Sequence, residues 1–158
     1  MKEHLQKCID EASRLYHRLV VVVGPHGSGK TRVLRELAAT KGYPFVNVSL
    51  ELSKQLKNIP PRKRALEIYP VMEDMLNPTG EVVLLDNIEL LFEPTLQLRP
   101  LDLLKRLSRN RTLVVAWPGE KKKETLIHAQ PGHPEYVQEP IDGFHVIEIT
   151  QRMQSSGA

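Results

Sequence analysis

The sequence has 158 residues and almost no cysteine: Cys8 is the only one. A lone cysteine cannot form an intramolecular disulfide, so a disulfide-stabilised secreted scaffold is excluded and a cytoplasmic location is expected. Long apolar runs are also missing. The run at residues 19–23 has about five residues, whereas a membrane-spanning helix needs about 20. The first residues, MKEHLQKC, lack the apolar core of a signal peptide, so we expect neither secretion nor a membrane partner.

Neither sign of charge dominates the sequence, with 22 Lys and Arg against 19 Asp and Glu and a net charge of +3. The composition alone therefore does not indicate a nucleic-acid-binding protein. Basic residues nevertheless gather in three stretches, at 54–64, 99–111 and 121–123. These stretches are either solvated surfaces or contacts for an anionic partner, which could be a nucleotide, DNA or an acidic protein.

Apolar runs alternate with helical patterns along the chain. Buried strands are expected at 19–23, 45–48, 82–86, 113–117 and 144–149, because continuous β-branched runs are typical of parallel strands covered on both faces. Helices are expected at 2–17, at 30–40, from Ser49 as cap to a break at Pro60 and Pro61, from there to about 76, and from Pro100. Pro70 should end or kink the helix that runs to about 76. Residues 125–129 could form a hairpin strand, and 131–140 is expected to be a proline-rich loop.

One glycine-rich motif follows the first strand and precedes a helix. It matches G-x-x-x-x-G-K-[ST] and consists of Gly24, Pro25, His26, Gly27, Ser28, Gly29, Lys30 and Thr31. Such a loop directs backbone N–H groups at phosphate oxygens, and the helix adds its positive dipole end. Lys30 would reach the β- and γ-phosphates, and the Thr31 hydroxyl would bind Mg²⁺. The sequence thus predicts an ATP site.

Asp86 ends the strand at 82–86, as a Walker B acid does, and is expected to hold Mg²⁺ together with Thr31. Many related ATPases have a glutamate directly after this acid, but Asn87 occupies that position here. Asn87 could orient the attacking water without acting as a base, and Glu89 could substitute for the missing glutamate or be an ordinary surface residue. We therefore expect hydrolysis to be slow.

Arg109 and Arg111 precede the fourth strand, and either could act on a neighbouring subunit as an arginine finger. The other interpretation is that they complement the negative end of the preceding helix dipole. Trp117 ends the fourth strand, where a polar residue often senses the γ-phosphate. It is expected instead to pack at the sheet edge.

These patterns predict an α/β fold: a P-loop NTPase-like three-layer sandwich with a mostly parallel five-stranded sheet and no helical lid domain. Residues 1–150 should form one domain, followed by a disordered tail at 151–158. Without a lid, bound ATP would stay exposed to water. We therefore expect a homo-oligomer or docking onto a larger ATPase.

Three segments, VVLLDNIELLFEP, LSRNRTLVVAWPG and AQPGHPEY, resemble BrxF, the small P-loop proteins of bacterial BREX phage-defence systems. The resemblance covers roughly residues 19–146. It implies a cytoplasmic bacterial protein that works beside a DNA methyltransferase and large ATPases. It also implies the nucleotide loop around Lys30 and Thr31 and the magnesium acid Asp86, but no catalytic base.

Two other functions stay open from the sequence alone. A small-molecule kinase would need acids after the second strand and an arginine-rich lid, but the second strand ends in Asn47, Val48 and Ser49. A DNA-binding adaptor that uses ATP only to set its shape would account for the basic stretches at 54–64 and 99–111.

Overall fold

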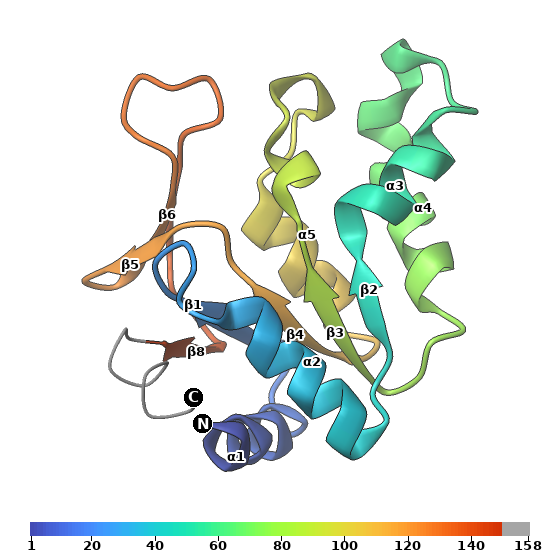
Figure 1. The fold of residues 1–158 in the computed structure, drawn as a ribbon. Helices are drawn as coiled ribbons and strands as arrows, with labels where there is room; N and C mark the ends of the chain where they lie inside the picture. The colour runs from blue at the N-terminus through green and yellow to red at the C-terminus, as the bar shows by residue number, and fades with distance from the viewer. Residues whose placement is uncertain (150–158) are drawn as a thin grey trace.

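The computed structural model describes residues 1–149, and the tail expected at 151–158 lies outside the described residues. The main sheet has five parallel strands in the order β2-β3-β4-β1-β8 (Figure 1). Their bounds are β1 Leu19–Val23, β2 Phe45–Asn47, β3 Val82–Asp86, β4 Thr112–Ala116 and β8 His145–Glu148. A smaller antiparallel sheet has the order β5-β6-β7, with β5 Glu120–Lys122, β6 Thr125–His128 and β7 Val137–Pro140.

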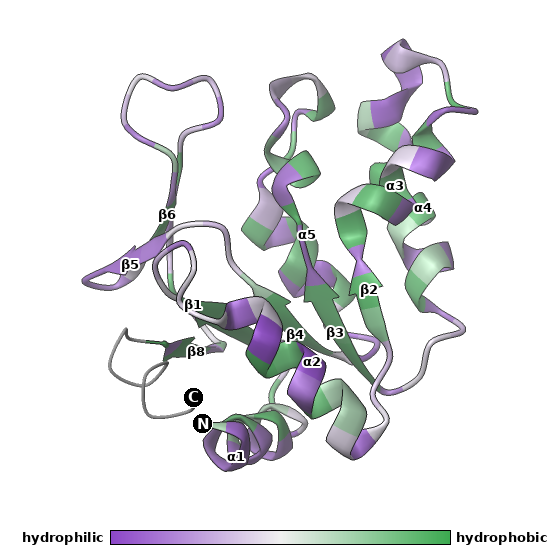
Figure 2. Ribbon diagram, in the orientation of Figure 1, coloured by the Kyte–Doolittle hydropathy of each residue, from purple (hydrophilic) through white to green (hydrophobic). Residues whose placement is uncertain are grey.

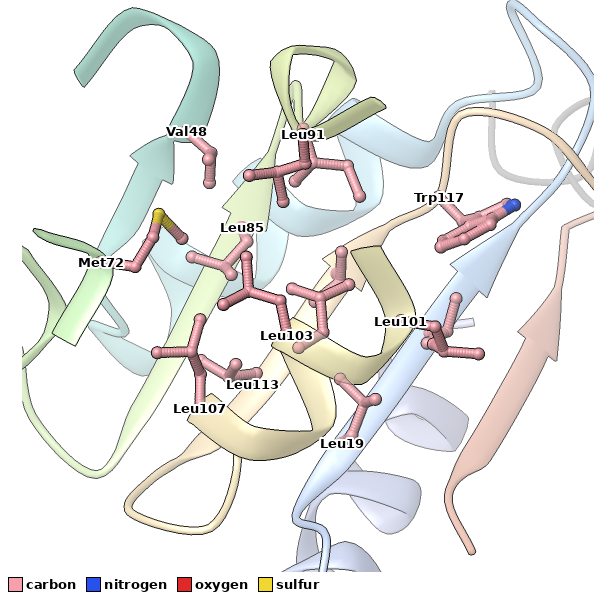
Figure 3. Close-up of a cluster of buried hydrophobic side chains, with 14 of the residues drawn as sticks. Leu19, Val48, Met72, Leu85, Leu91, Leu101, Leu103, Leu107, Leu113 and Trp117 are labelled. Carbon is pink, nitrogen blue, oxygen red and sulfur yellow. The ribbon is translucent and has the colours of Figure 1, made fainter. Parts of the chain in front are cut away.

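Helices cover both faces of the main sheet. Alternate side chains of β1 separate two cores, with Leu19, Val21 and Val23 on one face and Val20 and Val22 on the other. The first face packs against α3 Val48–Leu56, α4 Arg64–Leu76, α5 Pro100–Leu107 and the 3-10 turn η2 Glu89–Phe92. Figure 3 shows a side chain from each of these four elements meeting there: Val48, Met72, Leu103 and Leu91. The second face packs against α1 Lys2–Ala12 and α2 Lys30–Lys41.

The arrangement is a three-layer α/β sandwich around a parallel five-stranded sheet, as predicted. Figure 2 shows apolar residues along the central strands, as the burial of β1 on both faces requires. It also shows polar residues on the outer helices α1 and α2. Two further 3-10 turns, η1 Pro61–Lys63 and η3 Pro94–Leu96, join these elements. Among residues 1–149, α5 is the last helix, and no helix there is both long and apolar enough to cross a membrane.

Several boundaries differ from those predicted. The first helix ends at Ala12 rather than near residue 17, because the backbone N–H groups of Arg14 and Leu15 bond to carbonyls three residues back. Asn47, not Ser49, caps α3 through a 3.1 Å bond from the Leu50 N–H to its side-chain oxygen.

Prolines at two places bear on the predicted boundaries. Pro70, expected to end or kink its helix, lies inside α4 and does not end it. Its ring removes the donor for the carbonyl of Leu66, a residue that is 82% exposed, so water can replace that donor. Residues 137–140, expected to belong to a loop, form β7 at the edge of the small sheet, where Pro140 is tolerated.

Candidate nucleotide-binding site

The glycine-rich loop joins the carboxyl end of β1 to the first turn of α2. Gly27 has φ 79° and Gly29, the N-cap residue of α2, has φ 100°. Residues with a Cβ are strained in this left-handed region, so both positions favour glycine. A 2.9 Å bond from the Ser28 N–H to the Pro25 carbonyl closes the turn. Backbone of this kind forms a concave anion-binding nest at the start of a helix.

Lys30 lies across the mouth of the loop. Its Nζ donates to the backbone carbonyls of Gly24 and Trp117, both at 2.9 Å, so it links the loop to the end of β4. Burial lowers the pKa of the Lys30 ammonium, whereas the negative charges of Glu89 and Asp86 act in the opposite direction. The cation is therefore held in a partly dehydrated place, facing two carboxylates.

Thr31 and Asp86 bring hydroxyl and carboxylate oxygens together beside Lys30. Thr31 Oγ1 donates to Asp86 Oδ2 at 3.0 Å and Oδ1 at 3.2 Å. Thr31 lies in the first turn of α2 and Asp86 ends β3, so helix and strand ends fix this pair. Mg²⁺ in phosphate sites uses few carboxylates and hydroxyls together with water and phosphate oxygens. The two side chains therefore fit a magnesium ion.

A cleft of about 1200 Å³ opens over the loop. One wall contains the loop, the first turns of α2, Asp86 at the end of β3, and Asn87 and Glu89 after it. The opposite wall comes from the connection after β4 and from the β5–β6 hairpin, with Pro118, Gly119, Glu120, Ile127, Ala129 and Gln130. Sequence reasoning missed this second wall, because nothing in the pattern of 118–130 shows that the hairpin turns toward the loop.

Asn87 and Glu89 have different surroundings. Asn87 adopts the left-handed conformation at φ 51°, and its amide Nδ2 donates to Asn47 Oδ1 at 2.9 Å. Its backbone carbonyl accepts from the N–H and the hydroxyl of Ser49. Asn87 therefore fixes the turn after β3 against the start of α3. Both residues line the cleft, but Asn47 holds the amide of Asn87, whereas Glu89 is exposed. Glu89 is therefore the better placed of the two to face a water at the phosphates.

Arg109 and Arg111 lie at the amino end of β4, whereas the loop lies at the carboxyl end of β1, so the structure does not bring them to the cleft. Arg111 is 3% exposed and forms a bidentate pair with Glu73, with N–O distances of 2.6 and 2.9 Å. It is unavailable as an arginine finger in this arrangement. Arg109 is exposed and stacks on the ring of Tyr16, so a role for it on a neighbouring subunit stays a prediction.

Trp117 is a packing residue, as predicted, but it lies in the core rather than at the sheet edge, because β4 is an inner strand that ends at Ala116 and Trp117 is fully buried. Its Nε1 donates to the carbonyl of Ile127 at 3.0 Å, which anchors the β5–β6 hairpin. Gly119 makes this packing possible, since a Cβ there would lie 1.9 Å from the same carbonyl oxygen. The side chain of Trp117 thus holds the hairpin while its backbone carbonyl holds Lys30.

Ser28 contributes an unusual feature beneath the loop. Its hydroxyl is buried and has no hydrogen-bond partner among the described residues. A Cβ at Gly24 would lie 2.5 Å from this oxygen and 2.7 Å from the carbonyl of Ile149. An unpaired buried hydroxyl costs free energy, and functional loops are a common place for such a cost.

Comparisons with known proteins add little to this geometry. No family model matches the chain, and no curated protein matches it in sequence. Among solved structures, that of C. elegans PCH-2 is similar in fold, with a TM-score of 0.48 and 15% sequence identity. The match covers 94% of this chain but 42% of that one, so this chain spans less than half of that protein's length. The assignment of the candidate site therefore depends on the geometry of this chain's own residues.

Proposed function

We propose that this protein binds ATP with Mg²⁺ and hydrolyses it slowly. The observation that carries the proposal is the convergence of Lys30, Thr31 and Asp86 beside a loop with two left-handed glycines. The loop N–H groups and Lys30 would hold the phosphates, and Thr31 and Asp86 would hold the metal ion. Bound Mg²⁺ neutralises negative charge on the phosphates. The unpaired Ser28 hydroxyl fits a loop that adjusts when an anion enters it.

Replacing Asp86 with asparagine should remove the Mg²⁺-dependent gain in ATP affinity and leave binding in excess EDTA unchanged. The amide keeps the size of the side chain and can still accept from Thr31, but it loses the charge that attracts the ion. Titration of a fluorescent ATP analogue with and without Mg²⁺ measures both affinities. Asp74→Asn, an exposed change on α4, is the matched control. An unchanged Mg²⁺ dependence would reduce Asp86 to a structural strand-end acid.

Glu89 is the candidate for orienting or deprotonating the attacking water. The isolated protein should hydrolyse ATP more slowly than the ~1–100 s⁻¹ of protein kinases. The reason is that Asn87, not a glutamate, follows Asp86 directly, and its amide is bonded to Asn47. Glu89→Gln should lower the rate by about 100-fold, within the range for general-base catalysis. A phosphate-release assay measures this, with Glu124→Gln in the exposed β5–β6 turn as control. Equal rates for both variants would exclude Glu89.

The cellular role that we propose is that of a cytoplasmic component of a bacterial BREX anti-phage complex. The resemblance of residues 19–146 to the BrxF family supports this role. Glu89 and the loop residues 25–27 are exposed at the cleft, so a second copy or a larger ATPase could cover them and exclude water. A specific ATPase activity that rises with protein concentration supports assembly of copies of this chain, and a constant one contradicts it.

A further inference from the structure

A second hollow, of about 510 Å³, lies at the opposite edge of the main sheet from the nucleotide loop. It is formed by the segment before β1, the middle of α4, the end of α5 and the residues that follow α5. None of the six described residues that line it is acidic: they are Leu15, Tyr16, Tyr69, Arg106, Arg109 and Asn110. We call this feature the Tyr–Arg hollow.

Two tyrosine–arginine stacks form the walls of the Tyr–Arg hollow. Arg109 Cζ lies 4.7 Å from the centroid of the Tyr16 ring, and Arg106 Cζ lies 3.6 Å from that of Tyr69. Tyr16 is nonetheless 67% exposed and Leu15 is 40% exposed. The helix dipole accounts for arginines at the end of α5. Beside them the ring of Tyr16 is a flat surface open to water, on which another flat group can stack.

The charges around the hollow are mostly positive. Arg18 lies next to it and donates to the Arg109 carbonyl at 3.5 Å. Glu73, which accepts from the lining residue Tyr69, is already neutralised by the bidentate pair with Arg111, which holds its pKa at about 2. Asn110 also donates to Glu73, so that acid faces donors on several sides. An anionic partner would therefore find free guanidinium groups and no competing free carboxylate among the lining residues.

We propose that the Tyr–Arg hollow binds a single-stranded nucleic acid. A strand alternates flat bases with phosphates, and the hollow presents the exposed ring of Tyr16 beside the exposed guanidinium groups of Arg106 and Arg109. Bases stack on tyrosine without regard to sequence, and guanidinium groups pair with phosphate in a bidentate manner. An acidic peptide would match the arginines but would leave the exposed face of Tyr16 without a stacking partner. This inference does not rest on the nucleotide cleft, which lies at the other edge of the sheet.

The test uses the full chain and a fluorescein-labelled 20-nucleotide oligo-dT, with binding followed by fluorescence anisotropy at several salt concentrations. Tyr16→Ala should weaken binding by about 5- to 100-fold, the range for one stacked base, with the salt dependence unchanged. Arg109→Gln should weaken binding and also reduce the slope of log K against log salt by about 0.7, the value for one phosphate contact on a single strand. Lys122→Gln makes the same charge change on the exposed β5 strand and should alter neither.

Three results would overturn the proposal. The first is no oligo-dT binding at low salt, and the second is binding that Tyr16→Ala leaves intact, which would indicate a general cationic surface. The third is equally strong competition by a glutamate-rich peptide, which would assign the hollow to a protein partner. Thermal melting checks that each variant is folded. Lys30→Ala should bind oligo-dT as the wild type does, so a failure of the ATP site and a failure of this site are distinguishable.

Discussion

Replacing Lys30 with alanine is expected to weaken ATP binding by about 100-fold or more. Hydrogen bonds to charged groups contribute about 1.5–3 kcal/mol each, and an ammonium that reaches both the β- and γ-phosphates would form at least two. A loss of about 3 kcal/mol corresponds to about two decades in Kd. The fold should survive, because the bonds from Lys30 to Gly24 and Trp117 end on backbone carbonyls, and burial already disfavours the charged form of Lys30.

Trp117 gives this experiment its own readout. It is the only tryptophan of the chain, it lines the cleft, and its carbonyl accepts from Lys30 in the absence of nucleotide. ATP that draws Lys30 toward phosphate should change the tryptophan fluorescence of the wild type but not that of Lys30→Ala. Lys41→Ala, at the exposed far end of the same helix, is the control for loss of a positive charge. ATP affinity near the wild-type value in Lys30→Ala would refute the nucleotide site.

The main sheet and the loop were predictable because their causes are local. The run at 19–23 is apolar at every position, as expected for a strand that is buried on both faces. The glycines at 27 and 29 mark the two positions of the loop where the backbone is left-handed. The prediction that residues 125–129 form a hairpin strand is confirmed by β6, since turn residues precede it. Convergence of Thr31 with Asp86 followed from the parallel order, which places the ends of β1 and β3 at one edge.

The features that the sequence did not predict depend on contacts between residues that lie far apart in the chain. β7 was missed because its inward residue is a charged one: Glu139 is 4% exposed and accepts from Arg99 at 2.8 Å and from the Leu101 N–H at 3.3 Å. The predicted roles of Asn87 and Arg111 considered only their neighbours in sequence. The structure engages Asn87 with Asn47 and Arg111 with Glu73, about 40 residues away in each case.

Replacing Arg111 with alanine should destabilise the protein without changing the ATPase rate of each folded molecule. The guanidinium is buried, forms two bonds to Glu73 and donates to the Leu107 carbonyl at 2.9 Å. Removing one partner of a buried pair costs about 3–5 kcal/mol, and we expect the low end because the Glu73 side chain is 22% exposed and water can reach it. For a chain of this length, a loss of about 3 kcal/mol lowers Tm by about 6–12 °C.

Arg109→Ala is the matched control, two residues away. Arg109 is exposed and stacked on Tyr16, so its removal should cost about 0.5–1 kcal/mol, the value for an exposed cation–π contact. Denaturant unfolding of both variants measures the difference, and a phosphate-release assay at a temperature where both are folded measures activity. If Arg111→Ala kept full stability and lost activity, Arg111 would be a catalytic group acting on a neighbouring subunit, contrary to its burial here.

The pair of Glu73 with Arg111 also predicts how stability changes with pH. The Arg111 hydrogen bond, as the largest cause, lowers the pKa of Glu73 in the folded protein from 4.5 to about 2. A carboxylate with a lowered pKa stabilises the fold above its unfolded-state pKa, and that stabilisation is lost as the pH falls toward the folded-state value. The free energy of unfolding of the wild type should therefore decrease between about pH 5 and pH 2, partly because of Glu73. Arg111→Ala removes the cause of the shift, so the stability difference between wild type and variant should be largest near pH 7 and shrink toward pH 2. A difference that stays constant with pH would mean that Arg111 stabilises the fold by packing rather than through its charge.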